Sequence, residues 1–92
     1  MKIALDYDGT YAEDPELWDL FIEQADERGH EVTIVTMRDG LVRPIEHEVR
    51  CDVIYTNLNG KLDYCEALGI DFDIWIDDHP EWVLNDWEDR WS

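Results

Sequence analysis

The chain has 92 residues, 45% of them hydrophobic, and its 24 acidic residues outnumber 7 basic ones to give a formal net charge of −17. This length predicts a single domain over 1–92, and five Trp, four Tyr and two Phe supply apolar material for a core. The charge disfavours nucleic acid and anionic membranes as partners, because a field of this sign repels both.

Features that would direct the chain to a membrane or out of the cell are missing from the sequence pattern. No apolar stretch approaches the ~20 residues of a membrane span. Asp6 interrupts the region that a signal peptide keeps apolar. The two cysteines, Cys51 and Cys65, are far apart and form no CxxC motif, which fits a reducing compartment. We therefore expect a cytoplasmic protein with no membrane contact.

Short β-rich runs alternate with amphipathic segments along the chain. Asp14 is a suitable N-cap for a first helix, and Gly29 is a suitable residue to end it. In chain order we expect a strand over 2–6, a helix that begins at Pro15 and ends before Gly29, a strand over 32–36, a short helix over 41–50, a strand over 52–56, a helix over 61–68, a strand over 72–76 and a helix after Pro80.

This alternation predicts βαβ units and therefore an α/β fold. We expect a three-layer, Rossmann-like parallel sheet of about four strands with helices on both faces. In the last helix, Val83, Trp87 and Trp91 recur every four residues, with Trp82 beside them. Such a stripe is more typical of a core or an interface than of a ligand platform, and an exposed part of it predicts a surface for homo-oligomer formation.

Polar side chains follow the predicted strands at their carboxyl ends, where open parallel sheets bind ligands. Carboxylates that meet there repel one another, and a hard cation with oxygen ligands, typically Mg²⁺ beside a phosphate, removes the repulsion. A lysine at a helix N-terminus complements the anion. The residues are Asp6 and Asp8 after the first strand, Thr36 and Arg38 after the second, Thr56 and Asn57 after the third, Asp77 and Asp78 after the fourth, and Lys61 at the start of the helix over 61–68.

Paired carboxylates at such a site also suit phosphoryl transfer. One carboxylate can attack phosphorus and form an aspartyl phosphate. A second can protonate the leaving oxygen and later take a proton from water. The remaining requirements are positioning and charge neutralisation, which the metal and Lys61 would provide. The residues therefore predict a site for Mg²⁺ and a phosphate together.

The run from Asp6 to Thr10, DYDGT, resembles the DxDGT signature of the haloacid dehalogenase superfamily of phosphotransferases. Further along the chain, Thr36 is similar to the second motif of that family, Lys61 to its third, and the pair Asp77-Asp78 to its acidic fourth motif. The resemblance covers residues 3 to about 80. It implies the sheet order 3-2-1-4, with strands numbered along the chain.

The resemblance also implies roles for the carboxylates. Asp6 would be the nucleophile and a Mg²⁺ ligand. Asp8 would be the general acid and base, and its backbone carbonyl would reach the metal. Asp77 would be a further ligand, and Asp78 would assist directly or through water. Family members that are ATPases or dehalogenases lack the second aspartate of the first motif, so the presence of Asp8 points to a phosphatase.

The phosphate-binding residues that the resemblance implies are Thr36 and Lys61. Arg38 is equally compatible with a substrate contact and with a solvated loop. Only three residues separate Thr10 from Asp14, where metabolite phosphatases of the family often carry a cap domain, and the gap between the second and third motifs is also short. The chain therefore resembles the capless class, whose substrates are often macromolecular or whose neighbouring subunits serve as lids.

Two classes of function remain open at this stage. The first is a Mg²⁺-dependent phosphatase that acts on a phosphorylated small molecule or macromolecule, with a nucleotidase among the options. A polynucleotide-end phosphatase is disfavoured by the net charge, although divalent ions can bridge. The second is a binding or regulatory protein that keeps the pocket and has little or no turnover. Small size and the missing cap favour the second class, and the full set of carboxylates opposes it.

Overall fold

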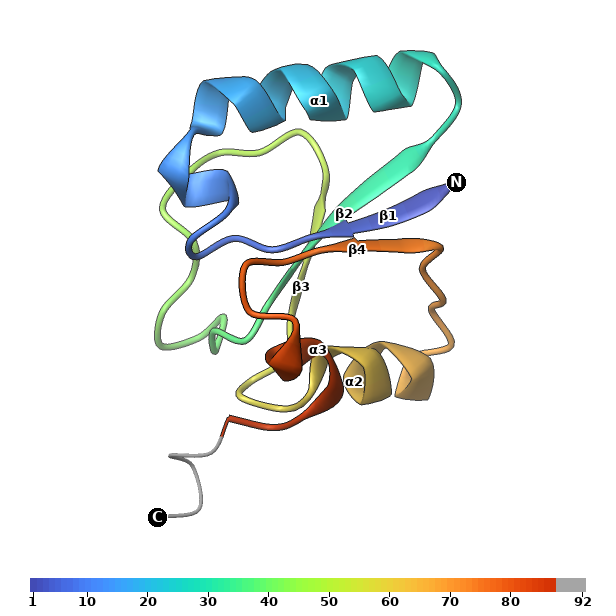
Figure 1. The fold of residues 1–92 in the computed structure, drawn as a ribbon. Helices are drawn as coiled ribbons and strands as arrows, with labels where there is room; N and C mark the ends of the chain where they lie inside the picture. The colour runs from blue at the N-terminus through green and yellow to red at the C-terminus, as the bar shows by residue number, and fades with distance from the viewer. Residues whose placement is uncertain (88–92) are drawn as a thin grey trace.

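The computed structural model describes residues 1–87 and forms one sheet with helices on either side (Figure 1). In chain order the elements are β1 (Lys2–Leu5), the 3₁₀ turn η1 (Tyr11–Glu13), α1 (Pro15–Glu27), β2 (Glu31–Thr36), β3 (Asp52–Tyr55), α2 (Lys61–Ala67), β4 (Ile74–Ile76) and α3 (Glu81–Leu84).

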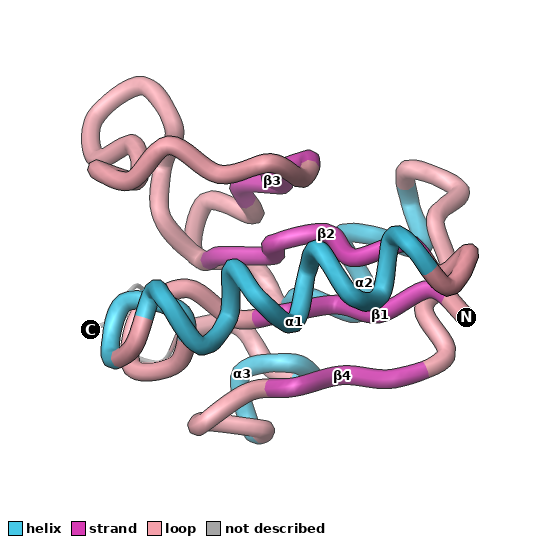
Figure 2. The backbone as a smooth tube through the Cα atoms, turned by 90° about the horizontal axis from the view of Figure 1, so that it is seen from above, coloured by secondary structure: helices cyan, strands magenta, loops and turns pink. Residues whose placement is uncertain are grey.

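The sheet has four parallel strands in the order β3-β2-β1-β4. Ile3 of β1 pairs with Val32 on one side and with Ile74 on the other. Helix α1 covers one face, and α2 and α3 lie on the opposite face (Figure 1); from above, α1 lies across β1 and β2 (Figure 2). The predicted α/β fold and strand order are thus confirmed, and the central position of β1 brings its carboxyl end to the middle of the edge.

Both faces of the sheet are buried by apolar side chains. On the α1 side, Leu5 and Ile34 are fully buried and pack with Ile22 of the helix. On the other side, Ala4 packs with Val35 and Cys65. Adjacent residues of β1 therefore point into different cores, which explains why the strand is apolar throughout rather than alternating.

The first helix agrees closely with its sequence signals. The Asp14 carboxylate accepts a hydrogen bond from the Leu17 backbone N–H at 3.2 Å, as an N-cap does. Beyond the C-terminal end, Gly29 has a φ of +83°, a conformation that glycine adopts without steric cost. Helix α1 therefore begins and ends where the capping residues predicted.

The helix expected over 41–50 is wrong: this stretch is a loop. Pro44 has no N–H for a helical hydrogen bond, and Leu41 would have been an inward residue but is 96% exposed. The loop makes a hydrogen bond to a residue of the sheet: the Ile45 backbone N–H donates to the Tyr55 hydroxyl at 3.2 Å. This contact with β3 replaces hydrogen bonds that a helix would have made internally.

The last helix is also shorter than expected. It ends at Leu84, because Asn85 takes an extended backbone with φ −124° and ψ 151°. Val83 is buried as predicted, but Trp87 lies beyond the helix, so the predicted stripe at helical spacing is wrong for that residue. Trp91 lies outside the described residues. Among residues 1–87, no helix combines the length and apolar character needed to cross a membrane.

Candidate active site

Asp6 lies directly after β1, at the centre of the carboxyl edge. Its backbone N–H donates to the Ile76 carbonyl of β4 at 2.9 Å, which fixes the two strand ends side by side. The carboxylate is 7% exposed. One oxygen accepts from the Lys61 ammonium at 2.7 Å, and the other accepts from the Thr10 hydroxyl at 3.1 Å. The carboxylate is therefore held by two donors from different elements.

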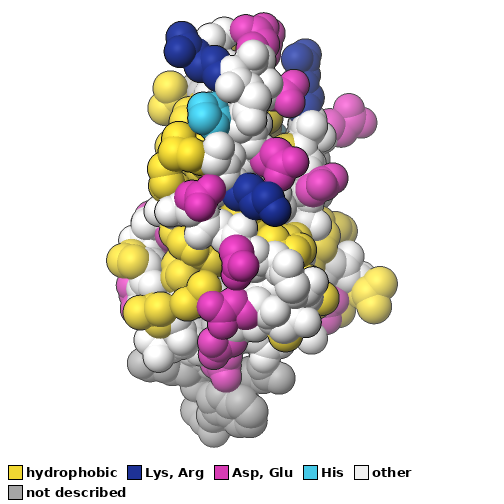
Figure 3. Space-filling model, turned by 90° about the vertical axis from the view of Figure 1, so that its right-hand side faces the viewer, with side chains coloured by type: hydrophobic (Ala, Val, Ile, Leu, Met, Phe, Trp, Pro, Cys, Tyr) yellow, Lys and Arg dark blue, Asp and Glu magenta, His cyan; other side chains and the backbone are white. Residues whose placement is uncertain are grey.

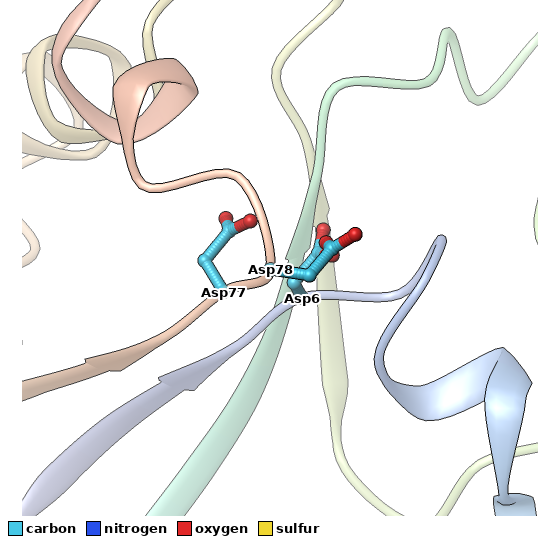
Figure 4. Close-up of side chains that lie close together, drawn as sticks. All are labelled: Asp6, Asp77 and Asp78. Atoms are coloured by element: carbon cyan, nitrogen blue, oxygen red, sulfur yellow. The ribbon is translucent and has the colours of Figure 1, made fainter.

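The aspartate pair after β4 completes an acidic group with Asp6, and the three side chains lie together beyond the two strand ends (Figure 4). Each contributes a carboxylate oxygen, and these oxygens lie within 4.8 Å of one another. Asp77 also accepts from the Lys61 ammonium and, at 2.9 Å, from the His79 backbone N–H. Of the four carboxylates predicted to converge, Asp6, Asp77 and Asp78 lie together beside Lys61, whereas Asp8 is not part of this group.

The charge of this group fits a divalent cation. Three carboxylates against one ammonium leave two formal negative charges, which the double positive charge of one Mg²⁺ would balance. Burial raises the pKa of Asp6 to about 7; a hydrogen bond with Asp78 adds to the rise, and Lys61 opposes it. A cation would occupy the place of that proton. The atoms available to bind the metal are all carboxylate oxygens, so the residues suit Mg²⁺, with Asp6, Asp77 and Asp78 as the ligands.

Gly9 explains how Asp78 can approach the first turn. Its φ is +81°, and a Cβ at this position would overlap the Asp78 carboxylate. The Asp-Gly pair therefore serves two purposes: it makes a turn in the left-handed region, and it leaves room for a carboxylate from β4. Asp8, which directly precedes Gly9, is not part of the group formed by Asp6, Asp77 and Asp78, and its carboxylate pairs with Arg38 instead.

Asp8 makes a two-point ion pair with Arg38. The guanidinium donates from Nη2 to one carboxylate oxygen at 2.7 Å and from Nε to the other at 2.9 Å. Arg38 has a side chain only 9% exposed, and it also donates to the Pro44 carbonyl at 3.2 Å. The hydrogen bonds from Arg38 hold the pKa of Asp8 below its usual range. In this structure Arg38 thus contacts Asp8 and the 41–50 loop.

A small cavity of about 50 Å³ adjoins the acidic group. Its lining is formed by Asp6, Asp8, Met37, Lys61, Trp82 and Trp87. Thr36, predicted to bind phosphate, is 1% exposed, and its hydroxyl oxygen accepts from the Arg38 backbone N–H at 3.3 Å. Its neighbour Met37, rather than Thr36, is part of the lining. A larger hollow of about 340 Å³ lies at the amino ends of β2 and β3, away from the carboxylates.

Sequence reasoning missed two contributions to this site. The sequence pattern gives Thr10 no role beyond its place in DYDGT, yet its hydroxyl lies 3.1 Å from Asp6 and 3.5 Å from Asp78. Trp82 and Trp87 were assigned to a core or an interface, yet both line the cavity. The positions of the two tryptophans in the sequence could have indicated this. The segment that starts at Pro80 follows the strand-end aspartates closely and therefore stays near the same edge of the sheet.

Comparison with known proteins adds no assignment to this geometry. No protein-family model, no curated protein and no solved structure matches the chain. The functional argument therefore depends on the residues and their contacts alone.

Proposed function

We propose that the protein is a Mg²⁺-dependent phosphatase that hydrolyses phosphate monoesters through an aspartyl phosphate on Asp6. The observation that carries the proposal is the environment of Asp6: a carboxylate at the edge of a cavity, held by Lys61 and grouped with Asp77 and Asp78. The resemblance of the run DYDGT, residues 6–10, to the DxDGT signature of the haloacid dehalogenase superfamily supports the same assignment.

The bond changes follow from this placement. A carboxylate oxygen of Asp6 attacks phosphorus, the bond from phosphorus to the ester oxygen breaks, and the leaving oxygen takes a proton from Asp8. Water then attacks phosphorus, Asp8 takes its proton, and inorganic phosphate leaves as the Asp6 carboxylate is restored. Lys61 offsets negative charge on the phosphoryl group throughout.

The metal would be held by Asp6, Asp77 and Asp78, and the chemistry it supplies is neutralisation of charge on phosphoryl oxygens. Side chains of the protein orient the carboxylates. Thr10 orients Asp6 through its hydroxyl, and Lys61 fixes the distance between Asp6 and Asp77 because its ammonium donates to both. These contacts exist before any substrate binds, which lowers the cost of organising the site.

The test is Asp6→Asn, which keeps the shape of the side chain and removes its nucleophilic charge. We expect phosphate release from 4-nitrophenyl phosphate in Mg²⁺ to fall to background, with an unchanged circular dichroism spectrum. Asp63→Asn, at an exposed acid on α2, is the matched control and should retain the wild-type rate. If Asp6→Asn keeps a tenth of the wild-type rate, the covalent mechanism is wrong.

A second function, phosphate-ester binding without useful turnover, is favoured by the Asp8–Arg38 pair. An aspartate held as an anion by a buried guanidinium carries no proton for a leaving group. In that case the wild-type protein would bind phosphate esters in Mg²⁺ and release no phosphate from them. A polynucleotide end is a weaker candidate substrate, because the net charge of −17 repels the polymer.

A further inference from the structure

Three aromatic rings form a column that starts next to the acidic group and ends at the cavity. His79, two residues after Asp77, stacks on Trp82 with ring centroids 4.3 Å apart and planes inclined by 28°. Trp82 stacks on Trp87 at 4.8 Å and 14°. Both indoles line the cavity that also holds Asp6 and Lys61. The catalytic carboxylate thus faces an aromatic wall across a small space.

This wall is anchored by backbone contacts from the residues around it. The Trp87 backbone N–H donates to the Leu58 carbonyl at 3.0 Å. Asp86 accepts from the Gly60 backbone N–H at 2.7 Å, directly before Lys61. Gly60 also permits a close approach, since a Cβ there would lie 3.2 Å from the Asn85 carbonyl carbon. The stretch 85–87 is therefore docked against the start of α2, and the indoles are placed relative to Lys61.

The size of the cavity limits what it can hold. The cavity, of about 50 Å³, has room for a group of only a few heavy atoms. A phosphoryl group beside Asp6 and Lys61 would use most of this space. The organic part of a phosphate ester would then lie against the apolar part of the lining, which Met37, Trp82 and Trp87 form.

From this geometry we infer that Trp82 and Trp87 determine substrate specificity by packing against a planar aromatic group of the phosphate ester. Trp82 offers the edge of its ring for this contact, because His79 and Trp87 cover its two faces. The inference rests on the proposed phosphatase function and names its substrate class. Indoles favour aromatic partners, because edge-to-face or stacked contact between aromatic rings adds an interaction that a saturated ring of similar size lacks. Aryl phosphates and nucleoside monophosphates share this chemistry, since every nucleobase has a planar face.

The experiment measures binding with phosphonates, whose P–C bond a phosphatase of this kind does not cleave, so turnover does not enter the result. Benzylphosphonate and cyclohexylmethylphosphonate are matched in size and differ in planarity. We expect calorimetry in Mg²⁺ to show benzylphosphonate binding about tenfold more tightly to the wild-type protein, a preference in the range that contact between aromatic rings supplies. A nucleoside 5′-phosphonate separates the two sources: tighter binding than benzylphosphonate indicates nucleotides, and weaker binding indicates aryl esters.

Variants of the wall identify the residues responsible. Trp82→Leu should abolish the preference for benzylphosphonate, and Trp82→Phe should keep most of it. Trp75→Phe is the matched control, because Trp75 packs on Phe72 and does not line the cavity. If Trp82→Leu does not fold, Trp87→Leu serves in its place, with folding followed by circular dichroism.

Each outcome is decisive. Equal binding of the two phosphonates by the wild-type protein, or a preference that survives in both leucine variants, overturns the inference and leaves the proposed phosphatase intact. Tighter binding of 3-aminopropylphosphonate than of benzylphosphonate also overturns it, in favour of cation recognition by the indoles. No binding of any phosphonate or of inorganic phosphate contradicts both the inference and the proposed function.

Discussion

Asp8 meets the Arg38 guanidinium through hydrogen bonds of 2.7 and 2.9 Å, and at the scale of single residues this contact decides the charge state in which Asp8 rests. A carboxylate with two such donors holds its proton weakly. General acid catalysis needs the opposite, a protonated carboxyl beside the leaving oxygen. If Asp8 is the acid, it must leave Arg38 when an ester binds.

Asp8→Asn tests the acid role through the leaving group. An alkyl phosphate needs a proton on its leaving oxygen, so we expect its hydrolysis rate to fall by about 100-fold or more. The loss for 4-nitrophenyl phosphate should be much smaller, because nitrophenolate leaves without protonation. Steady-state phosphate release from both esters is the measurement. Equal losses on the two substrates would exclude Asp8 as the general acid.

Arg38→Met tests the ion pair and has a defined sign with pH. Arg38 lowers the pKa of Asp8, so its removal raises that pKa and Asp8 keeps its proton to higher pH. We therefore expect the alkaline limb of the kcat/KM profile for an alkyl phosphate to move to higher pH. The profile for 4-nitrophenyl phosphate, which needs less protonation, is the internal control. An alkaline limb that moves to lower pH, or stays in place, contradicts the role given to the pair.

The residue-scale predictions from sequence succeeded where strand ends determine position. Asp6 and Asp77 follow neighbouring strands, and Lys61 begins a helix at the same edge, so parallel topology alone brings them together. The direction of Asp8 was not predictable in this way. It lies three residues past the strand, beside Gly9 with its positive φ, and its partner Arg38 is 30 residues further along the chain.

At the scale of elements, the strands were predictable because each is a short apolar run, whereas the loop over 41–50 and the short α3 were not. Helical spacing of apolar residues predicted a helix in that loop, but some of its hydrogen bonds go to distant residues: Tyr55 accepts from Ile45, and the Tyr7 hydroxyl lies 2.5 Å from His47 Nδ1. The spacing of apolar residues contains no information about such long-range partners, so it predicts a helix even where tyrosines elsewhere in the fold offer hydrogen bonds.

The turn between β1 and η1 should depend on Gly9 for its stability. Gly9 and Gly29 both have positive φ, of +81° and +83°, and alanine at either position should cost about 1–2 kcal/mol of folding free energy. Around Gly29 a Cβ meets no atom within 4 Å, whereas at Gly9 it overlaps Asp78. Urea denaturation with and without Mg²⁺ should therefore show a larger loss for Gly9→Ala, and a loss of Mg²⁺ stabilisation for this variant only. Equal losses for the two variants would show that Asp78 does not depend on the turn.

At the scale of the whole molecule, the net charge of −17 comes from acids dispersed over the chain rather than from one tail. On the face that Figure 3 shows, acidic side chains are scattered among other types. A field from dispersed charges attracts divalent cations generally but is weak at any one point, whereas three carboxylates within 4.8 Å of one another form a local site. Stability measurements can separate these two effects.

Mg²⁺ should stabilise the fold through the site of Asp6, Asp77 and Asp78. Binding to the folded chain alone adds about 2.7 kcal/mol at a hundredfold excess over Kd, and ~1 kcal/mol raises the melting temperature of a domain this small by about 4–8 °C. The wild-type protein should therefore melt higher in millimolar Mg²⁺ than in chelator at matched ionic strength.

Asp78→Asn is the discriminating variant for this prediction, because Asp77 and Asp6 both pair with the buried Lys61, whereas the Asp78 side chain is 37% exposed. The substitution removes a repelling charge without leaving that lysine short of a partner, so the variant should be no less stable than wild type in chelator. It should lose most of the Mg²⁺ increment, while Asp63→Asn, at an exposed acid on α2, should keep it. General screening of the −17 charge would instead raise the melting temperature of all three proteins equally, and monovalent salt would reproduce it. A full Mg²⁺ increment in Asp78→Asn would show that Asp78 is not a ligand and that the cation binds elsewhere.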